Sequence, residues 1–317
     1  MNPSSPQLST PAIASSSSPR AMVSLDGILH DAAGAQVSVF DRGFLYGDSV
    51  FETLRTYFGR PYALQEHLQR LENSAKRVLI PMPVPRDVWC REIEQTIAAA
   101  GFSESYVRVM LTRGRGEQLG LDPALARQPL RLVLVLPLEA PVAHKYERGI
   151  GAIIYRTQRV ADGTDAAGAK LGNYLTAVLA THAARLAQAE EALLVDREDQ
   201  VLEGATSNVF GVASGHLITA PEECGILAGI TRARILAVAH QLGLPVVMRP
   251  LRVAELATLN ELFISSSIRE IFPVVSVDGD PIRDGHPGPI TRELLGAFRA
   301  RARAEVRGEP VEAEPEA

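Results

Sequence analysis

The chain has 317 residues, 46% of them hydrophobic, so it is long enough for two domains that each bury a core. Its net charge of −5 and its scattered arginines argue against nucleic-acid binding, which requires a clustered basic face. No apolar run is long enough to cross a bilayer, so a membrane protein is not expected either.

The ends of the chain and its two cysteines set further limits. Residues 1–22 are rich in Ser and Pro, are expected to be disordered, and lack the apolar core of a secretory signal peptide. Residues 304–317 are charged and are expected to be a disordered tail. Cys90 and Cys224 lie far apart without metal-ligand spacing, which predicts neither a disulfide scaffold nor a metal site and fits a reducing, cytoplasmic compartment.

A first structural unit, a small α/β domain, is expected over residues 23–137. Hydrophobic periodicity predicts a strand, two helices and two further strands over residues 50–57, 66–78, 86–100, 106–112 and 131–136. In the second strand, Tyr106, Arg108 and Met110 share one face. A tyrosine and an arginine on one strand face can bind a carboxylate, or they can form an ordinary exposed face, and the strand alone favours neither.

Residues 138–148 are expected to be a linker, and a larger second domain is expected over residues 149–303. Helices are predicted over residues 175–186 and 231–242, and strands over 192–196, 201–220 (a pair turned at Ser214) and 261–265. The first of these helices has apolar residues on one side, namely Leu175, Val178, Leu179 and Leu186. The mixture of strands and helices predicts a two-domain fold of the α+β or α/β class.

Lysine is scarce, and one lysine occupies a distinctive position. Lys76, Lys145 and Lys170 are the three lysines among 32 Lys and Arg residues. Lys76 lies on a charged helix face and Lys145 in a polar stretch, whereas Lys170 follows the small residues 166–169. Small apolar neighbours favour a functional amine over a surface lysine, so Lys170 is a candidate for the Schiff base of a pyridoxal phosphate site.

Such a site also needs an acid for the pyridine nitrogen and donors for the phosphate. Glu203 lies among small and apolar residues, where it is a candidate for that acid rather than an exposed turn glutamate. Gly229 precedes a helix that starts at Ile230 and Thr231, and the free N–H groups of a helix start bind anions. Residues 265–267 are three serines after a strand end, which add hydroxyl and amide donors.

Two more side chains fit the same chemistry. Arg70, on the first helix, can balance the phosphate charge, although a solvated helix arginine is the commoner case. Tyr174 lies four residues after Lys170 and is expected on the same side of a helix start. Its phenol can donate a hydrogen bond to the 3-oxygen of the cofactor or can simply pack.

The order of these motifs resembles the class IV aminotransferases, which are the fold-type IV pyridoxal phosphate enzymes. The resemblance covers residues 23–298 and is carried by segments 44–52, 66–71, 170–175, 202–210, 229–232, 265–274, 277–279 and 287–291. It implies a D-amino acid aminotransferase-like fold of two domains, and a homodimer in which each active site borrows a loop from the neighbouring subunit. It also implies pyridoxal 5′-phosphate as cofactor, bound by Lys170, Glu203, Tyr174, Arg70, Ile230, Thr231 and Ser267.

Within that family, residues 106–108 and 112–123 are most similar to branched-chain amino acid aminotransferases. The similarity implies a substrate pocket lined by Tyr46, Phe51, Tyr106, Arg108 and Ile268. The implied reaction moves an amino group between L-leucine, L-isoleucine or L-valine and a 2-oxo acid such as 2-oxoglutarate. D-amino acid aminotransferases resemble residues 206–210 almost as well, but they trap a carboxylate with an arginine and a histidine, and the loop at 112–123 has no histidine.

Other reactions on the same fold stay open. Residues 51–55 are compatible with an aminodeoxychorismate lyase, which eliminates pyruvate, although the pair Tyr106 and Arg108 is better explained by an amino acid substrate. A non-catalytic relative is disfavoured, because Lys170, Glu203 and residues 229–231 are costly to keep without use.

Two departures from the branched-chain pattern occur in one segment. Residues 266–268 are Ser-Ser-Ile where Gly-Thr-Ala is usual, and Arg269 follows where a small residue is usual. The guanidinium of Arg269 can bind an acidic side chain or a carboxylate, or can face solvent.

Overall fold

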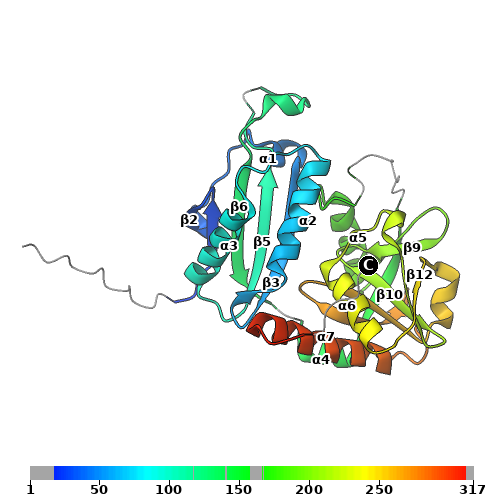
Figure 1. Cartoon of the computed structure of the whole chain (residues 1–317). Helices are drawn as coiled ribbons and strands as arrows, with labels where there is room; N and C mark the ends of the chain where they lie inside the picture. Colours follow the sequence, from blue (N-terminus) through cyan, green and yellow to red (C-terminus); the bar gives the residue numbers. More distant parts are fainter. Residues whose placement is uncertain (1–17, 117, 140, 158–165, 167, 312–317) are drawn as a thin grey trace, which may run out of the picture.

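The first unit is a β-sheet covered by helices on one face, as the computed structural model of the chain shows (Figure 1). The structure describes residues 18–116, 118–139, 141–157, 166 and 168–311. The sheet has six strands in the order β2-β1-β6-β5-β3-β4. Their bounds are β1 Met22–Leu25, β2 Ile28–Asp31, β3 Ser49–Tyr57, β4 Arg60–Pro61, β5 Ser105–Thr112 and β6 Leu130–Pro137.

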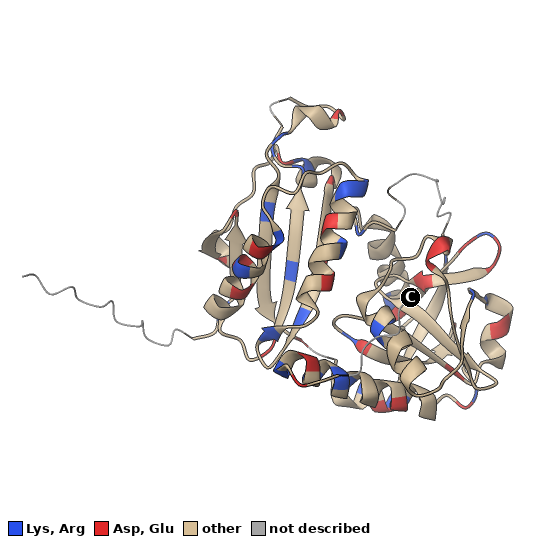
Figure 2. Cartoon of the chain, viewed as in Figure 1, with Lys and Arg blue, Asp and Glu red and all other residues tan. Residues whose placement is uncertain are grey.

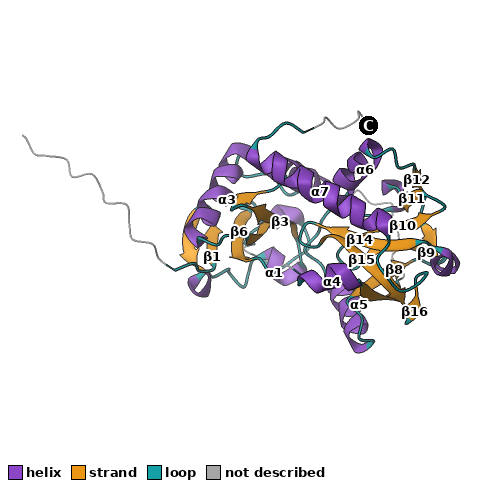
Figure 3. Cartoon of the chain, turned by 90° about the horizontal axis from the view of Figure 1, so that it is seen from below, coloured by secondary structure: helices purple, strands orange, loops and turns teal. Residues whose placement is uncertain are grey.

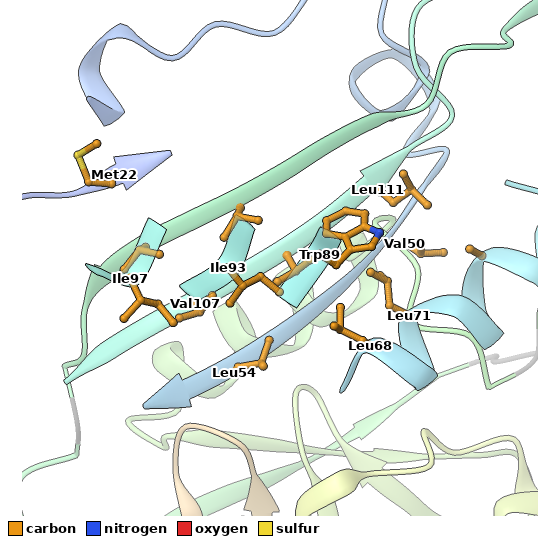
Figure 4. Packing of buried hydrophobic residues seen from close by; sticks show 14 of the residues in the cluster. Met22, Val50, Leu54, Leu68, Leu71, Trp89, Ile93, Ile97, Val107 and Leu111 are labelled. Carbon is orange, nitrogen blue, oxygen red and sulfur yellow. The ribbon is translucent and has the colours of Figure 1, made fainter. Parts of the chain in front are cut away.

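Helices α2 (Leu64–Arg77) and α3 (Arg86–Ala100) pack on this sheet through apolar residues at helical spacing. Trp89 and Ile93 of α3 are fully buried in one cluster with the β3 and β5 side chains Val50, Leu54, Val107 and Leu111 (Figure 4). The opposite face of β3 and β5 remains available to the second unit.

The second unit is a larger mixed sheet. Nine strands follow the order β12-β11-β10-β14-β15-β7-β8-β9-β13, and β16 pairs with β15. Strand β7 runs parallel to both β8 and β15, as β11 does to β12, and the other pairs are antiparallel. The bounds are β7 Ile150–Arg156, β8 Glu191–Val195, β9 Gln200–Gly204, β10 Asn208–Ala213, β11 His216–Thr219, β12 Val246–Met248, β13 Leu251–Arg252, β14 Glu261–Ser266, β15 Glu270–Val277 and β16 Asp280–Pro281.

Helices α6 (Ile230–Gln241) and α7 (Pro289–Arg307) cover one face of this sheet, and the rings of Phe210 and Phe263 stack at 4.9 Å beneath them. Helix α7 also reaches the first unit, because Tyr62 meets Phe298 edge to face at 6.2 Å. The view from below shows α7 extending from the second sheet toward the first (Figure 3). Helix α5 (Leu175–Leu186) packs on β7 and β8.

The structure differs from the sequence-based boundaries at several places. Met22 begins β1, although residues 1–22 were predicted to be disordered. The expected linker at residues 138–148 contains helix α4 (Ala143–Arg148), and α7 ends at Arg307 rather than near residue 303. The reason for the longer helix is that its apolar side continues through the buried Val306. Residues 1–17 and 312–317 of the predicted tails lie outside the described residues.

The apolar side of helix α5 is its exposed side. Its largest apolar side chains are exposed by 50 to 74%, namely Leu175, Val178, Leu179 and Leu186. The buried residues are Ala180 and Ala184, whose small side chains let the helix lie close to β8. An apolar helix face is therefore left on the surface of the subunit.

Basic and acidic residues are interspersed along the helices of both units (Figure 2). Across the described ranges, no helix has the length and apolar character that crossing a membrane requires.

Candidate active site

A cavity of about 1150 Å³ opens between the two units and collects most of the residues that the sequence singled out. The first unit contributes Phe51, Tyr106 and Arg108 from β3 and β5, and Arg70 from α2. The second unit contributes Lys170, Tyr174, Glu203, Ile230, Thr231, Ser267 and Ile268. Residues more than 200 positions apart in the chain thus line one cavity.

The backbone of Lys170 is attached to the first unit. Its N–H donates to Ser74 Oγ at 3.1 Å, and its carbonyl accepts from the N–H of Phe51 at 3.1 Å. At Gly172, a Cβ atom would lie 2.1 Å from Ser49 Oγ, so a side chain there would force the two segments apart. The segment that carries Lys170 is therefore fixed against β3, and its side chain lines the cavity.

Aromatic and basic side chains surround the Lys170 amine. Nζ donates to the hydroxyl of Tyr174 at 3.1 Å and lies 4.6 Å from the centre of the Phe51 ring. The guanidinium of Arg108 lies 3.8 Å from the same ring centre, and the rings of Phe51 and Tyr174 meet edge to face at 5.0 Å. Tyr174 was expected on the same side of a helix start as Lys170, but α5 begins only at Leu175 and Tyr174 is its N-cap, so helical spacing does not bring the two side chains together.

Glu203 lies on β9 and is half-buried at the wall of the cavity. Its Oε2 accepts a hydrogen bond from the N–H of Leu227 at 3.1 Å. This bond holds the carboxylate next to the segment that leads into α6.

The start of α6 lies so close to Asn208 that its N-cap has no room for a side chain. Gly229 is its N-cap, and a Cβ there would lie 1.9 Å from Asn208 Oδ1. Asn208 Nδ2 in turn donates to the Leu227 carbonyl at 2.9 Å. Because the first N–H groups of a helix have no acceptor within the helix, those at Ile230 and Thr231 are donors for an anion.

Arg70 connects this turn to a buried acid. Its Nη1 donates to the Ala228 carbonyl at 2.6 Å, and its Nε and Nη2 donate to the two oxygens of Glu52 at 2.8 and 2.7 Å. Burial alone would raise the pKa of Glu52, but Arg70 and His67 outweigh it and lower that pKa to about 2. Arg70 is therefore neither a solvated helix arginine nor an uncompensated charge.

The end of β14 and the turn after it form another part of the wall, and of the three serines expected beyond the strand only Ser267 follows its end. Ser265 Oγ is buried and finds no hydrogen-bond partner in the described part of the chain. Arg269 does not face solvent as a free cation: its Nη2 donates to Glu191 Oε2 at 2.6 Å and to Thr206 Oγ1 at 3.1 Å.

Tyr46 is the predicted substrate residue that this cavity does not include. It ends helix α1 (Arg42–Tyr46), its side chain is exposed, and its hydroxyl accepts from the N–H of Gly120 at 3.3 Å. Arg113, on the same loop as Gly120, is buried and binds Asp48 with Nε at 2.7 Å and Nη2 at 3.0 Å. Arg113 is therefore committed to the fold and is not a carboxylate trap.

The residues present fit pyridoxal 5′-phosphate. An amine, a carboxylate and a helix start with free N–H donors line one cavity. The unpartnered hydroxyl of Ser265 in the same wall is the kind of buried polar group that a ligand oxygen satisfies.

The sequence missed several residues that shape the site. Thr53 lines the cavity and is two positions from Phe51 on β3, so period-two alternation could have indicated it. Asn208 lies inside the predicted 202–210 motif but received no role. Glu52 lies inside the segment 44–52 but received no role, and Glu191 was not singled out, because the burial of both depends on partners that are distant in the sequence.

Comparison with known proteins points to one family. The family model described as amino-transferase class IV matches residues 49–277. A Methanocaldococcus jannaschii protein named as a putative branched-chain-amino-acid aminotransferase is 38% identical over 275 residues, which cover 87% of this chain and 94% of that protein. The solved branched-chain amino acid aminotransferase of Escherichia coli superposes with a TM-score of 0.84 at 30% identity, over 90% of this chain and 95% of that one. A T.th. enzyme of the same name, solved with pyridoxamine 5′-phosphate, has a TM-score of 0.84 at 27% identity, over 92% and 96%.

Proposed function

Because the chain belongs to the class IV aminotransferases, we propose that it moves the amino group of a branched-chain L-amino acid to a 2-oxo acid such as 2-oxoglutarate. It is a pyridoxal 5′-phosphate-dependent aminotransferase of fold type IV, with an amino acid and a 2-oxo acid as substrates. The observation that carries the proposal is the Lys170 amine, hydrogen-bonded to Tyr174 in a cavity that Glu203 and the α6 start also line.

When bound, the cofactor supplies an aldehyde carbon that condenses with amines and a ring that accepts an electron pair. Lys170 would be the amine that holds the cofactor and that moves the proton at the substrate α-carbon. The Tyr174 hydroxyl orients this amine at 3.1 Å. Glu203 would be the acid for the ring nitrogen, and the phosphate would be bound by Arg70, Ile230, Thr231 and Ser267.

The substrate side of the cavity suits two kinds of molecule. Phe51, Tyr106 and Ile268 offer apolar surface to a branched aliphatic side chain. Arg108 offers a cation to a carboxylate, which fits the second carboxylate of a dicarboxylic 2-oxo acid. The preference for branched-chain substrates is supported by the names of the relatives and by this combination of surfaces.

A half-reaction tests the proposed substrate. Single L- and D-amino acids are added to the holoenzyme, and absorbance follows the conversion of the bound cofactor to its pyridoxamine form. Rapid conversion by L-leucine, L-isoleucine or L-valine is the expected result. Conversion by D-alanine or D-glutamate alone would move the enzyme to the D-specific branch, and pyruvate release from aminodeoxychorismate without an amino acceptor would make it a lyase.

The active form is proposed to be a homodimer in which Tyr46 lines the cavity of the neighbouring subunit. Tyr46 is exposed and outside its own cavity, and large apolar side chains near it are exposed as well, namely Phe40, Phe44, Leu45, Leu119 and Leu121. The exposed face of α5 is a second apolar surface of this kind.

Mixed dimers test this proposal. Lys170→Ala and Tyr46→Ala chains are mixed under conditions of subunit exchange, with light scattering to measure the oligomeric state. If Tyr46 serves the neighbour, each mixed dimer has one site with both native residues, and activity returns. If the mixture stays as inactive as the separate variants, or if the protein is an active monomer, the proposal is wrong.

A cytoplasmic location is proposed as well. It is supported by Cys90 and Cys224, which are both free and belong to different units. Cell fractionation followed by detection of the chain is the measurement, and recovery in an oxidising compartment would contradict it.

A further inference from the structure

Two turns of the second unit meet at the wall of the cavity. The first connects β9 to β10 at residues 205–207, and the second connects β14 to β15 at residues 267–269. Both turns line the cavity, and strand β8 lies next to the first of them. Their relative position therefore decides the shape of this wall.

A buried carboxylate lies between the two turns. Glu191, the first residue of β8, is 3% exposed. Its Oε1 accepts from the N–H groups of Ala192 at 2.9 Å and Ala205 at 3.2 Å, and its Oε2 accepts from Ser207 Oγ at 2.9 Å. A Cβ at Gly204 would lie 3.1 Å from the carboxylate carbon, so this carboxylate has little room to move.

Arg269 supplies the positive charge. Its Nη2 donates to Glu191 Oε2 at 2.6 Å and to Thr206 Oγ1 at 3.1 Å, so one nitrogen reaches both the buried acid and the neighbouring turn. A buried carboxylate is costly unless it is paired and hydrogen-bonded, and a charge-assisted hydrogen bond is the strongest available partner. The pair therefore favours one arrangement of the two turns.

Other contacts hold the same turn from outside the cavity. The carbonyl of Ile268 accepts from Arg55 Nη1 at 3.4 Å, and the carbonyl of Arg269 accepts from the Tyr146 hydroxyl at 3.1 Å. Arg55 comes from the first unit and Tyr146 from α4, and neither lines the cavity. The side chain of Arg269 reaches from this turn to Thr206 of the other turn.

We propose that Arg269 is a positioning residue, whose ion pair with Glu191 joins the two turns and so fixes the wall against which cofactor and substrate bind. A direct role as a ligand of the substrate carboxylate is disfavoured, because Nη2 of Arg269 already donates to both Glu191 and Thr206. The inference rests on the proposed transamination, but it does not depend on which amino acid is the substrate.

Four variants of the full-length holoenzyme test this pair: Arg269→Met, Glu191→Gln, the double variant, and Arg269→Lys. Arg91→Met is the matched control, because it removes an exposed pair with Asp87 on α3, a helix that does not line the cavity. The first readout is the rate at which diluted holoenzyme releases pyridoxal 5′-phosphate, which requires no substrate. The second is kcat and KM for whichever amino acid the wild type uses best.

Arg269→Met and Glu191→Gln are each expected to release the cofactor about 10-fold faster and to raise KM by about 10- to 100-fold, since small displacements of binding groups have effects of this size. The double variant should be about as impaired as the worse single variant, because the two residues act as one unit. Arg269→Lys should recover part of the loss, and Arg91→Met should behave as wild type.

Two outcomes would overturn the inference. If Glu191→Gln lowers KM for dicarboxylic substrates while Arg269→Met raises it, Arg269 is a substrate ligand that Glu191 restrains. If the variants keep normal KM and cofactor release but contain fewer folded molecules, the pair only stabilises the fold. Failure of the proposed substrate assignment is a separate result, because it appears in the wild type and leaves the cofactor-release comparison intact.

Discussion

The amine of Lys170 lies 3.1 Å from the hydroxyl of Tyr174, although the two residues have different supports. Lys170 is held to β3 of the first unit through its backbone, whereas Tyr174 caps α5 of the second unit. The hydrogen bond between them therefore lies where the two units meet. Any relative movement of the units is expected to change the position of the amine.

Replacing Tyr174 with Phe should lower kcat by about 10- to 100-fold, because a hydrogen bond to a charged group contributes about 1.5–3 kcal/mol. The ring can still meet Phe51 edge to face, so the melting temperature should hardly change. Steady-state kinetics and thermal unfolding are the measurements. Tyr155→Phe, in a partly buried position outside the cavity lining, is the control, and an unchanged kcat in Tyr174→Phe would show that the hydroxyl has no role.

Glu203→Gln should reduce kcat by about 10²- to 10³-fold, the usual effect of removing one electrostatic partner from an active site. Glutamine keeps an oxygen that can accept from the Leu227 N–H, so the local fold should persist while the charge is lost. Kinetics together with the absorption spectrum of the bound cofactor measure this. Glu198→Gln, another carboxylate at the cavity, is the matched comparison, and equal losses in both variants would contradict a special role for Glu203.

Gly229→Ala should weaken cofactor binding by about 10-fold or more, because the new methyl group would lie 1.9 Å from Asn208 Oδ1 and must displace it. Equilibrium titration of the cofactor measures the change. Gly296→Ala is the control: apart from its chain neighbours and the adjacent backbone of α7, no described atom lies within 4 Å of its Cβ position, so the change should be neutral or stabilise by about 0.5–1 kcal/mol. Equal cofactor affinity in both variants would mean that the α6 start tolerates a side chain.

Stability should fall as the solution becomes acidic. The pKa of Glu52 drops from 4.5 to about 2 in the fold, so its contribution of about 3 kcal/mol is complete above pH 4.5 and is lost as pH falls toward 2. Burial is the main cause that lowers the pKa of His67 below 6.5. Protonation of His67 below pH 6.5 therefore favours the unfolded chain and adds to the loss of stability in acid. Urea midpoints from pH 7 to pH 3 measure the slope. Glu52→Gln should be less stable at pH 7 but should show a flatter slope below pH 5, and parallel slopes would contradict this account.

The two long helices of the first unit could be predicted from local sequence patterns. Helix α3 has the predicted bounds, and α2 was predicted within two residues at each end, because apolar spacing and capping residues are local signals. The predicted strand pair over residues 201–220 is instead three strands, β9, β10 and β11. Residues 205–207 interrupt it as a turn, and the sequence showed no Pro there.

The buried ion pairs could not be predicted from the sequence. Arg70 binds Glu52 across 18 positions, and Arg269 binds Glu191 across 78. Nothing in the local pattern around a charged residue identifies such a partner, because the partner depends on which strands are neighbours and on their register. For the same reason, the outward orientation of the apolar side of α5 appeared only in the folded chain.

The sequence by itself determined the chemistry of this protein. One lysine among small residues, an acid and a glycine-led helix start, in that order, predicted the cofactor, and the order of the motifs predicted the family. The tertiary structure decided which of these residues share a cavity, that Tyr46 is outside it, and that Arg70, Arg113 and Arg269 are each paired with an acid. The physical reason is that residue type limits what a side chain can do, whereas its charge partners and accessibility are set by packing between segments far apart in the chain.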